Sequence, residues 1–213
     1  MNFRILTSLA IGISVCAAYA GISAPDDADK FQTAIQAVVS DFNDNKIDAA
    51  LAKLQELQKS MPDDPSILNL LGSAYSKKKE YPVAEEYFRK ALDEISDFFP
   101  AAFNLGEILF LQKKYTESRD YFQKLRDQNR DNELLQYKVA LCDILLSDDE
   151  RAKKSMQSIK YPGDSPAWYY AQAAWEFKKG NAKKGREYVR VAKSIFSSKT
   201  TLFDETFANL HFK

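Results

Sequence analysis

Similar residues recur every 34 positions along most of this chain, and no other sequence feature constrains the fold as strongly. One series consists of small residues, Ala50, Ala84, Ser118 and Ala152. Two further series keep the same step: Leu54, Phe88, Phe122 and Met156, and Leu57, Ala91, Leu125 and Ile159. Within each copy the three members are four and three residues apart, so they line one face of a helix. Such a period predicts stacked helical units, because a single unit cannot cover its own apolar face.

A preceding helix in each repeat is indicated by Leu68, Leu71, Gly72 and Tyr75, and by Leu105-Gly106 one repeat later. A glycine at this place lets the paired helix approach closely. The combination resembles the tetratricopeptide repeat, whose pattern joins W-x2-L-G-x2-Y to A-x3-F-x2-A. The resemblance is strongest over 65–97, where Leu68 replaces the usual tryptophan and the matching residues are Leu71, Gly72, Tyr75, Ala84, Phe88 and Ala91.

The resemblance implies an all-α fold, a right-handed α-solenoid of about five helical hairpins over residues 31–198. The expected hairpins are 31–64, 65–98, 99–132, 133–166 and 167–198, and a C-terminal capping helix at 199–213 follows them. The first hairpin departs from the pattern, with Val38 in place of glycine and Asp41 in place of an aromatic residue. In the fifth, Gly185 and Ala192 come one residue early, which a turn at Gly180-Asn181 shortened by one residue would explain.

Residues 1–20 have the features of a secretory signal peptide. Arg4 precedes an apolar run, and Ala18-Tyr19-Ala20 forms a cleavage site with small residues at its first and third positions. We therefore expect an exported protein, periplasmic or secreted after cleavage near Ala20, with a flexible leader at 21–30.

Two other interpretations of this N-terminal segment remain open, a retained membrane anchor and lipid attachment at Cys16. The apolar run is short for a membrane span, which needs about 20 apolar residues. Lipid attachment would require a small residue directly before the cysteine, where this chain has Val15. Cleavage would leave Cys142 as the single cysteine, so the mature chain could form no internal disulfide.

Composition argues against several classes of function. Basic and acidic residues are equal in number, 30 of each, so the chain lacks the basic excess of a general nucleic-acid binder. One histidine and two cysteines are too few for a His/Cys metal site. The sequence contains no Gly-rich phosphate loop and no recognisable pairing of nucleophile and base. We expect no enzyme activity, no cofactor, no metal and no nucleic-acid partner.

Three residues or segments with reactive side chains have simpler structural interpretations. His211 lies near the C-terminus without evident catalytic partners, and Cys142 is expected to fill the core. The acidic run 148–150 falls where the second helix of the fourth hairpin should begin, so its charges suit the helix dipole better than a metal ion.

In the tetratricopeptide repeat family, peptides bind along the first helices of the hairpins, and the resemblance implies a similar concave groove here. The groove positions of the later hairpins are apolar or aromatic, and the residues predicted to bind a partner are Phe103, Phe110, Tyr137, Leu141, Ile144, Trp168 and Trp175. Aromatic anchors supply much of the energy in peptide recognition. The alternative is that the apolar C-terminal helix folds back and covers these rings. The Lys and Asn clamp with which some family members bind chaperone tails is absent.

Charge is distributed unevenly along the chain. Residues 21–64 carry 4 basic and 9 acidic residues (net −5), and 65–150 carry 12 and 16 (net −4). Residues 151–193 carry 11 and 3 (net +8), including a basic patch formed by Lys178, Lys179, Lys183, Lys184 and Arg186. Such a patch can steer an anionic partner, although charge runs also serve simply as solvated helix faces.

These observations predict a non-catalytic scaffold of the cell envelope that binds another protein or a peptide segment in its concave groove. The alternative is a membrane-associated assembly subunit that contacts lipid or a partner subunit through its basic C-terminal repeat.

Overall fold

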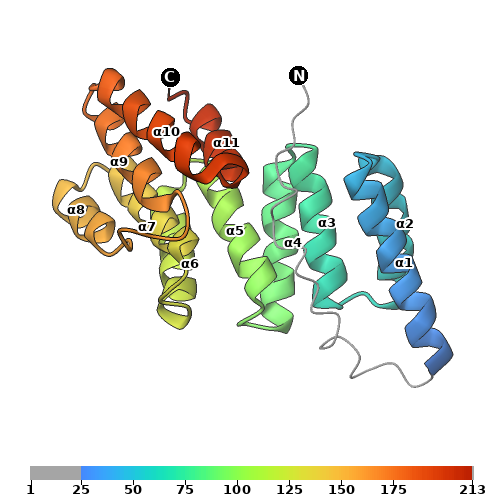
Figure 1. Ribbon diagram of the computed structural model, residues 1–213. Helices are drawn as coiled ribbons and strands as arrows, with labels where there is room; N and C mark the ends of the chain where they lie inside the picture. Colours follow the sequence, from blue (N-terminus) through green and yellow to red (C-terminus); the bar gives the residue numbers. More distant parts are fainter. Residues whose placement is uncertain (1–24, 213) are drawn as a thin grey trace. The chain divides into compact units, whose positions relative to one another are not determined.

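The computed structural model describes residues 25–212 (Figure 1). The predicted signal peptide, and residues 21–24 of the predicted leader, lie outside the described residues. The described chain is helical and contains no strand, as the sequence predicts. Its helices are α1 (Pro25–Asn43), α2 (Ile47–Ser60), α3 (Pro65–Lys77), α4 (Tyr81–Glu94), α5 (Phe99–Leu111), α6 (Tyr115–Gln128), α7 (Glu133–Leu145), α8 (Asp149–Gln157), α9 (Ala167–Lys178), α10 (Ala182–Phe196), the 3-10 helix η2 (Ser197–Thr200) and α11 (Thr201–Asn209).

The chain divides into two compact units, and the boundary lies within α5, between Ile108 and Leu109. In the first unit, α1 packs on α2, α2 on α3 and α3 on α4. In the second unit α7 is the central helix, because α6, α8 and α9 all pack against it. No helix within residues 25–212 has both the length and the apolar character needed to cross a bilayer.

The helices follow the sequence period closely. The first helices of four hairpins begin at Pro65, Phe99, Glu133 and Ala167, at steps of 34 residues. Asp64 caps α3 by accepting hydrogen bonds from the backbone N–H groups of Ser66 and Ile67, both at 2.9 Å. These bonds satisfy two of the donors that a helix start leaves without partners.

The turn inside each hairpin has one conformation. Three residues separate the paired helices, and the middle residue has a positive φ, at Asn45, Lys79, Lys113, Ser147 and Gly180. The next N–H reaches back over the end of the first helix, for example from Glu80 to the Tyr75 carbonyl at 2.9 Å. This is the Schellman pattern of helix termination.

The fifth hairpin shows where our expectation of a shortened turn is wrong. Its turn keeps three residues, and the missing residue is taken from the helix, because α9 has 12 residues whereas α3, α5 and α7 have 13. The N–H of Asn181 still bonds to the Glu176 carbonyl at 2.8 Å. The hydrogen-bonded turn therefore has the same geometry as in the other hairpins, and α9 is one residue shorter.

The predicted flexible leader is also wrong in part, since α1 begins at Pro25 and residues 25–30 are helical. Proline suits the first turn of a helix, where its fixed φ fits and its missing N–H would have no helical partner.

A close approach of the two helices is made in the second hairpin by a glycine. A Cβ added to Gly72 of α3 would lie 2.6 Å from Cε1 of Phe88 in α4, closer than real Cβ contacts. In the fifth hairpin the roles are exchanged, because a Cβ added to Gly185 of α10 would lie 2.8 Å from Cδ2 of Phe177 in α9. The second and fifth hairpins therefore each place a ring against a residue without a side chain.

Asp41 stands where the family pattern has an aromatic residue, and the paired helix explains this difference. In the second hairpin, Tyr75 of α3 stacks on Tyr87 of α4 with ring centroids 5.5 Å apart. In the first hairpin the same two places hold Asp41 and Lys53, which form an ion pair. One substitution thus accompanies the other, and the contact between the helices is kept.

In the fourth hairpin these two places hold Asp143 and Ser155, whose hydroxyl donates a hydrogen bond to the carboxylate. Asp143 is 1% exposed, and Arg119 of α6 lies 3.9 Å from its Oδ1 atom. Burial raises the pKa of Asp143 above its ordinary value, and the hydrogen bond from Ser155 and the charge of Arg119 oppose that shift.

The fourth hairpin also ends early. Helix α8 has 9 residues whereas α6 has 14, so Ile159 is buried but lies beyond the helix that the sequence predicted for it. The connection to α9 is held by the carboxylate of Glu133, which accepts hydrogen bonds from the N–H groups of Asp164 at 2.9 Å and Ser165 at 3.0 Å. A buried carboxylate with such partners fixes the path of this loop.

Replacing Gly72 by alanine tests the close approach in the second hairpin. Overpacking against Phe88 is expected to lower the free energy of unfolding by about 1–3 kcal/mol, although alanine alone would favour the helix by up to about 1 kcal/mol. Urea unfolding followed by circular dichroism measures the change. In a Phe88→Leu background, Gly72→Ala should lower the free energy of unfolding by less, or should raise it. Equal changes in both backgrounds would show that the Phe88 ring does not require the glycine.

Asp143 should make stability depend on pH in an unusual direction. Because its pKa is raised in the folded state, its favourable contribution is present at acid pH, below its unfolded pKa, and is lost as pH rises through the folded pKa. Thermal unfolding at a series of pH values should therefore show that Asp143→Asn raises stability near neutrality and flattens the acid part of the profile. Ser155→Ala removes a hydrogen bond that lowers the pKa, and should move the transition to higher pH. A profile unchanged by either substitution would contradict the assignment.

Candidate functional site

Most of the residues predicted to line a binding groove are core residues in this structure. The buried ones are Phe103, Phe110, Tyr137, Leu141 and Ile144, each at most 6% exposed. Phe103 lies in the first unit and the others in the second. Trp168 and Trp175 of α9 are partly exposed. Of the predicted set, only these two side chains are therefore available to a partner without rearrangement.

The burial of the α7 residues follows from the position of that helix in the second unit. With α6, α8 and α9 packed around it, 11 of its 13 residues are buried. The ring of Tyr137 is further covered by Phe203 of α11, at a centroid distance of 4.8 Å. For Tyr137 the structure therefore favours the alternative in which the C-terminal helix covers the predicted binding ring.

Helix α11 is held in this position by a polar cluster and by aromatic packing. The Tyr170 hydroxyl donates to Oδ1 of Asp204 at 2.6 Å, and Nζ of Lys193 lies 3.0 Å from the same atom. Burial and this carboxylate raise the pKa of Tyr170 well above its ordinary value, so the hydroxyl remains a donor. Phe207 and Phe212 pack against Phe177, at centroid distances of 5.9 and 5.2 Å.

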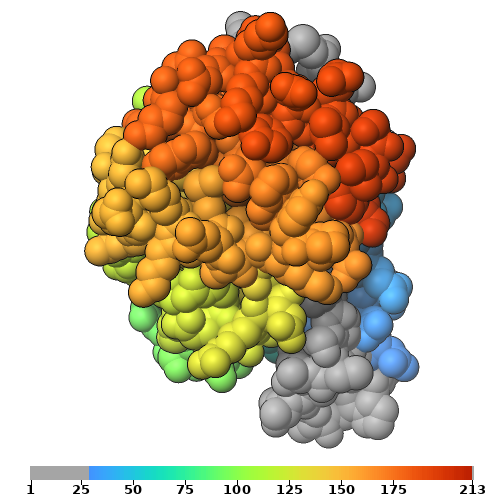
Figure 2. Space-filling model, turned by 60° about the vertical axis from the view of Figure 1, so that its left-hand side comes forward, coloured from blue at the N-terminus to red at the C-terminus, as the bar shows by residue number. Residues whose placement is uncertain are grey.

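Trp168 belongs to a group of rings that the sequence interpretation missed. We define the aromatic cluster as Tyr161, Trp168, Tyr169, Tyr188 and Phe196. Within it the Trp168 ring lies 4.2 Å from Tyr161, 5.1 Å from Tyr169 and 5.9 Å from Tyr188. Phe196 joins through Tyr169 at 6.1 Å. Figure 2 shows the face on which α8, α9 and α10, in orange, reach the surface.

The cluster combines a loop residue with residues of two helices. Tyr161 comes from the loop between α8 and α9 and is 58% exposed, while the other four rings are partly buried. A hydrogen bond with Tyr161 is the main cause that raises the pKa of Tyr169. The sequence signal was weak, because Tyr161 lies outside any helical period and only its neighbours Pro162 and Gly163 mark a loop.

The predicted basic patch is partly neutralised. Lys179 pairs with Asp149 and lies over the Trp175 ring, 4.7 Å from its centroid. Lys184 pairs with Glu176 at 2.6 Å, and this hydrogen bond lowers the pKa of the glutamate. The remaining members of the patch, Lys178, Lys183 and Arg186, are exposed. Lys179 and Lys184 therefore form contacts within the fold and also contribute to the charge of the surface.

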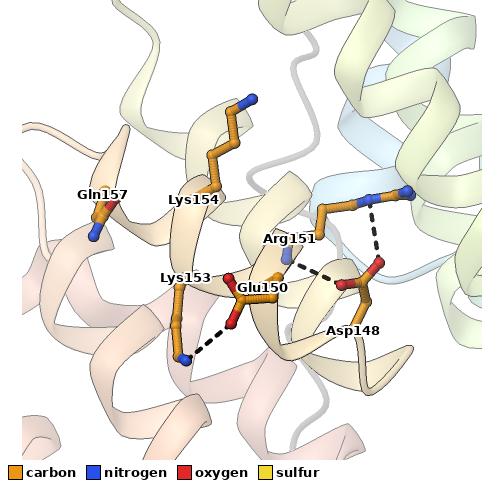
Figure 3. A pocket seen from close by; sticks show the side chains of 6 residues that line it. All are labelled: Asp148, Glu150, Arg151, Lys153, Lys154 and Gln157. Atoms are coloured by element: carbon orange, nitrogen blue, oxygen red, sulfur yellow. Dashed lines mark hydrogen bonds and ion pairs between the residues drawn. The ribbon is translucent and has the colours of Figure 1, made fainter.

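A hollow on α8 is lined mainly by charged side chains. Figure 3 shows its lining side chains, with Asp148 directed at Arg151 and Glu150 at Lys153. Asp148 caps α8 by accepting from the Arg151 N–H at 3.0 Å, and the Glu150–Lys153 pair measures 3.3 Å. The acidic run thus serves the helix start, as the sequence indicated. Within residues 25–212 no group of three or more His, Cys, Asp or Glu side chains is placed to hold a metal ion.

Cys142 and His211 occupy different environments. Cys142 is fully buried, with its Sγ 3.6 Å from the Ser118 hydroxyl, which agrees with its predicted place in the core. His211 is exposed and follows α11.

Comparisons with known proteins agree with this architecture. A sequence model of the tetratricopeptide repeat family matches residues 35–100 and 96–133. Among solved structures, MamA from residue 41 onward, from Desulfovibrio magneticus RS-1, is similar with a TM-score of 0.66 and 18% identity, over 81% of this chain and 98% of that one. YrrB, described as a TPR protein with an unusual peptide-binding site, has a TM-score of 0.59 and 19% identity, over 84% of this chain and 89% of that one.

A curated relative extends the likeness to a larger protein. The intraflagellar transport protein 70B of Bos taurus is 26% identical over 128 residues, 57% of this chain. This chain spans about a fifth of the length of that relative, because the match covers 19% of it. The similarities to the solved structures show a shared helical fold. The repeated helical hairpins and the match over residues 35–133 make this chain similar to the tetratricopeptide repeat family.

Proposed function

We propose that this chain is an exported, non-catalytic scaffold that binds a protein or peptide segment through the first helix of its fifth hairpin. The observation that carries the proposal is the partial exposure of Trp168 and Trp175, which lie seven residues apart on α9 and so on the same side of that helix. Tryptophan is among the residues that most often dominate binding energy at interfaces. Tyr137, Leu141 and Ile144 are buried on α7, which packs against α9.

The N-terminal sequence supports export. Residues 1–20 combine Arg4, an apolar run and the Ala18-Tyr19-Ala20 cleavage pattern. An exported scaffold of this family would act in the periplasm or outside the cell. Cys142 is free and buried, so the exported protein would depend on the packing of its repeats rather than on a disulfide.

Binding through α9 is tested by affinity capture from envelope extract with two variants. Trp168→Ala combined with Trp175→Ala should lose a partner that the unchanged protein retains, since losing two anchor rings typically weakens binding about 100-fold or more. Tyr87→Ala in the first unit removes a stacked ring of another hairpin and serves as the control. Equal capture by all three proteins would contradict the role of α9. Circular dichroism confirms that the variants remain helical.

Export is tested by expressing the full chain in a bacterium with an outer membrane and sequencing the N-terminus of the product. Cleavage after Ala20 should give a periplasmic protein that begins at Gly21. An intact N-terminus, or a lipid attached at Cys16, would replace this proposal with one of membrane attachment.

A further inference from the structure

Helices α10 and α11 follow one another without a loop, and the chain bends between them at an unfavourable residue. Helix α10 ends at Phe196, η2 covers Ser197–Thr200 and α11 begins at Thr201. Ser197 has φ 49° and ψ −115°, a conformation that glycine adopts readily and that strains the backbone of other residues. Residues 186–213 contain no glycine and no proline, the residues that commonly end a helix. The bend is therefore held by the contacts of α11 and not by residues that favour a bend.

One continuous helix is the unstrained alternative at this point. The N–H of Ser197 already donates to the carbonyl of Lys193, as it would inside a longer α10. Residues 198–201 are Ser, Lys, Thr and Thr, none of which stops a helix. A straight chain at Ser197 would place α11 beyond the end of α10, along the same axis, and so away from α9.

The contacts of α11 with the rest of the second unit are largely aromatic. Phe203 and Phe207 are each 5% exposed, and both rings lie 5.0 Å from the ring of Tyr170. Phe203 also covers Tyr137, and Asp204 accepts the hydrogen bond from the Tyr170 hydroxyl. Movement of α11 away from α9 would expose these rings on both sides of the contact. The same contacts form again only where α11 of another copy takes the vacated place.

We propose that α11 exchanges between two copies of this chain, so that α11 of each copy packs on α7 and α9 of the other. The contacts of α11 are the same in the closed monomer and in the exchanged dimer. Exchange relieves the strain at Ser197 in both copies, and strained hinges favour such exchange. The loss of translational and rotational freedom opposes it, so the balance depends on protein concentration.

This inference is independent of the proposed binding surface on α9. Tyr170 and Phe177, which contact α11, each follow one of the two tryptophans of α9 by two residues. Two residues correspond to about 200° around a helix, so the tryptophans lie on the other side of α9. Exchange of α11 therefore leaves Trp168 and Trp175 available to a partner.

Substitutions at Ser197 test the role of the strained hinge. The residue is exposed, so they leave the core unchanged. Sedimentation of the purified protein over a dilution series measures the dissociation constant of the dimer. Ser197→Gly relieves the strain of the closed form by about fivefold at each hinge and should raise this constant about 25-fold. Ser197→Ala retains the strain and favours a continuous helix, so it should lower the constant about fivefold.

The matched control is Ser198→Gly, one residue further along in η2. Ser198 is also exposed and is helical both in the closed form and in a continuous helix. The substitution should therefore change the dissociation constant little. Circular dichroism confirms that all of the variants remain folded.

A pair of charge variants tests whether α11 itself is exchanged. Nζ of Lys193 and Oδ1 of Asp204 lie 3.0 Å apart, and after exchange they would pair between copies. Asp204→Lys or Lys193→Asp alone places like charges at this contact. When the two variants are unfolded and refolded together, exchange would bring opposite charges together at both contacts of a heterodimer. Native mass spectrometry should show about fivefold more heterodimer than random pairing gives.

Three results would overturn the inference. One is a protein that stays monomeric at every concentration, in its Ser197→Ala form as well. Another is a dimer whose dissociation constant is the same with serine, glycine or alanine at position 197. The third is random pairing of the two charge variants, which would show that the copies associate through another surface. The capture experiment with the tryptophan variants judges the proposed function separately.

Discussion

The close approach of two helices within a hairpin is the constraint on which the repeated fold depends. A ring can be seated between the helices only where the opposite position has no side chain. In the second hairpin Gly72 on the first helix accepts Phe88 from the second helix, and in the fifth hairpin Gly185 on the second helix accepts Phe177 from the first. The family pattern specifies one of these solutions, whereas the physical requirement is satisfied by either.

A second contact between the paired helices, the one made by Tyr75 and Tyr87 in the second hairpin, tolerates different residues in other hairpins. Tyr75 and Tyr87 stack in one hairpin, Asp41 and Lys53 form an ion pair in another, and a carboxylate with a hydroxyl fills the place in a third. The energies differ, because a stacked ring pair is apolar and a buried carboxylate carries a desolvation cost. In each of these hairpins the two facing residues remain complementary. A residue that differs from the family pattern on one helix should therefore be considered together with the residue that faces it on the paired helix.

The sequence predicted the helical hairpins and their steps because burial of an apolar stripe forces a period onto the residues. It did not predict the helical start at Pro25, the shortened α9 or the early end of α8, because these depend on local turn geometry and on single contacts such as the Glu133 carboxylate with the loop before α9. The candidate site was predicted only in part. Trp168 and Trp175 were found from their register, but Tyr161 lies outside any period.

The irregular part of the second unit is where the accessible aromatic surface arises. A regular fourth hairpin would continue α8 as a helix, and residue 161 would then point along a helix face instead of lying over Trp168. Residues at regular repeat positions, such as Tyr137 and Leu141, are covered by neighbouring helices, because the stacking of repeats buries these positions. Only side chains that stacking leaves exposed are therefore available at the surface of such a fold. In this chain the loop after α8 supplies one of them, Tyr161, beside the tryptophan that the repeat itself provides.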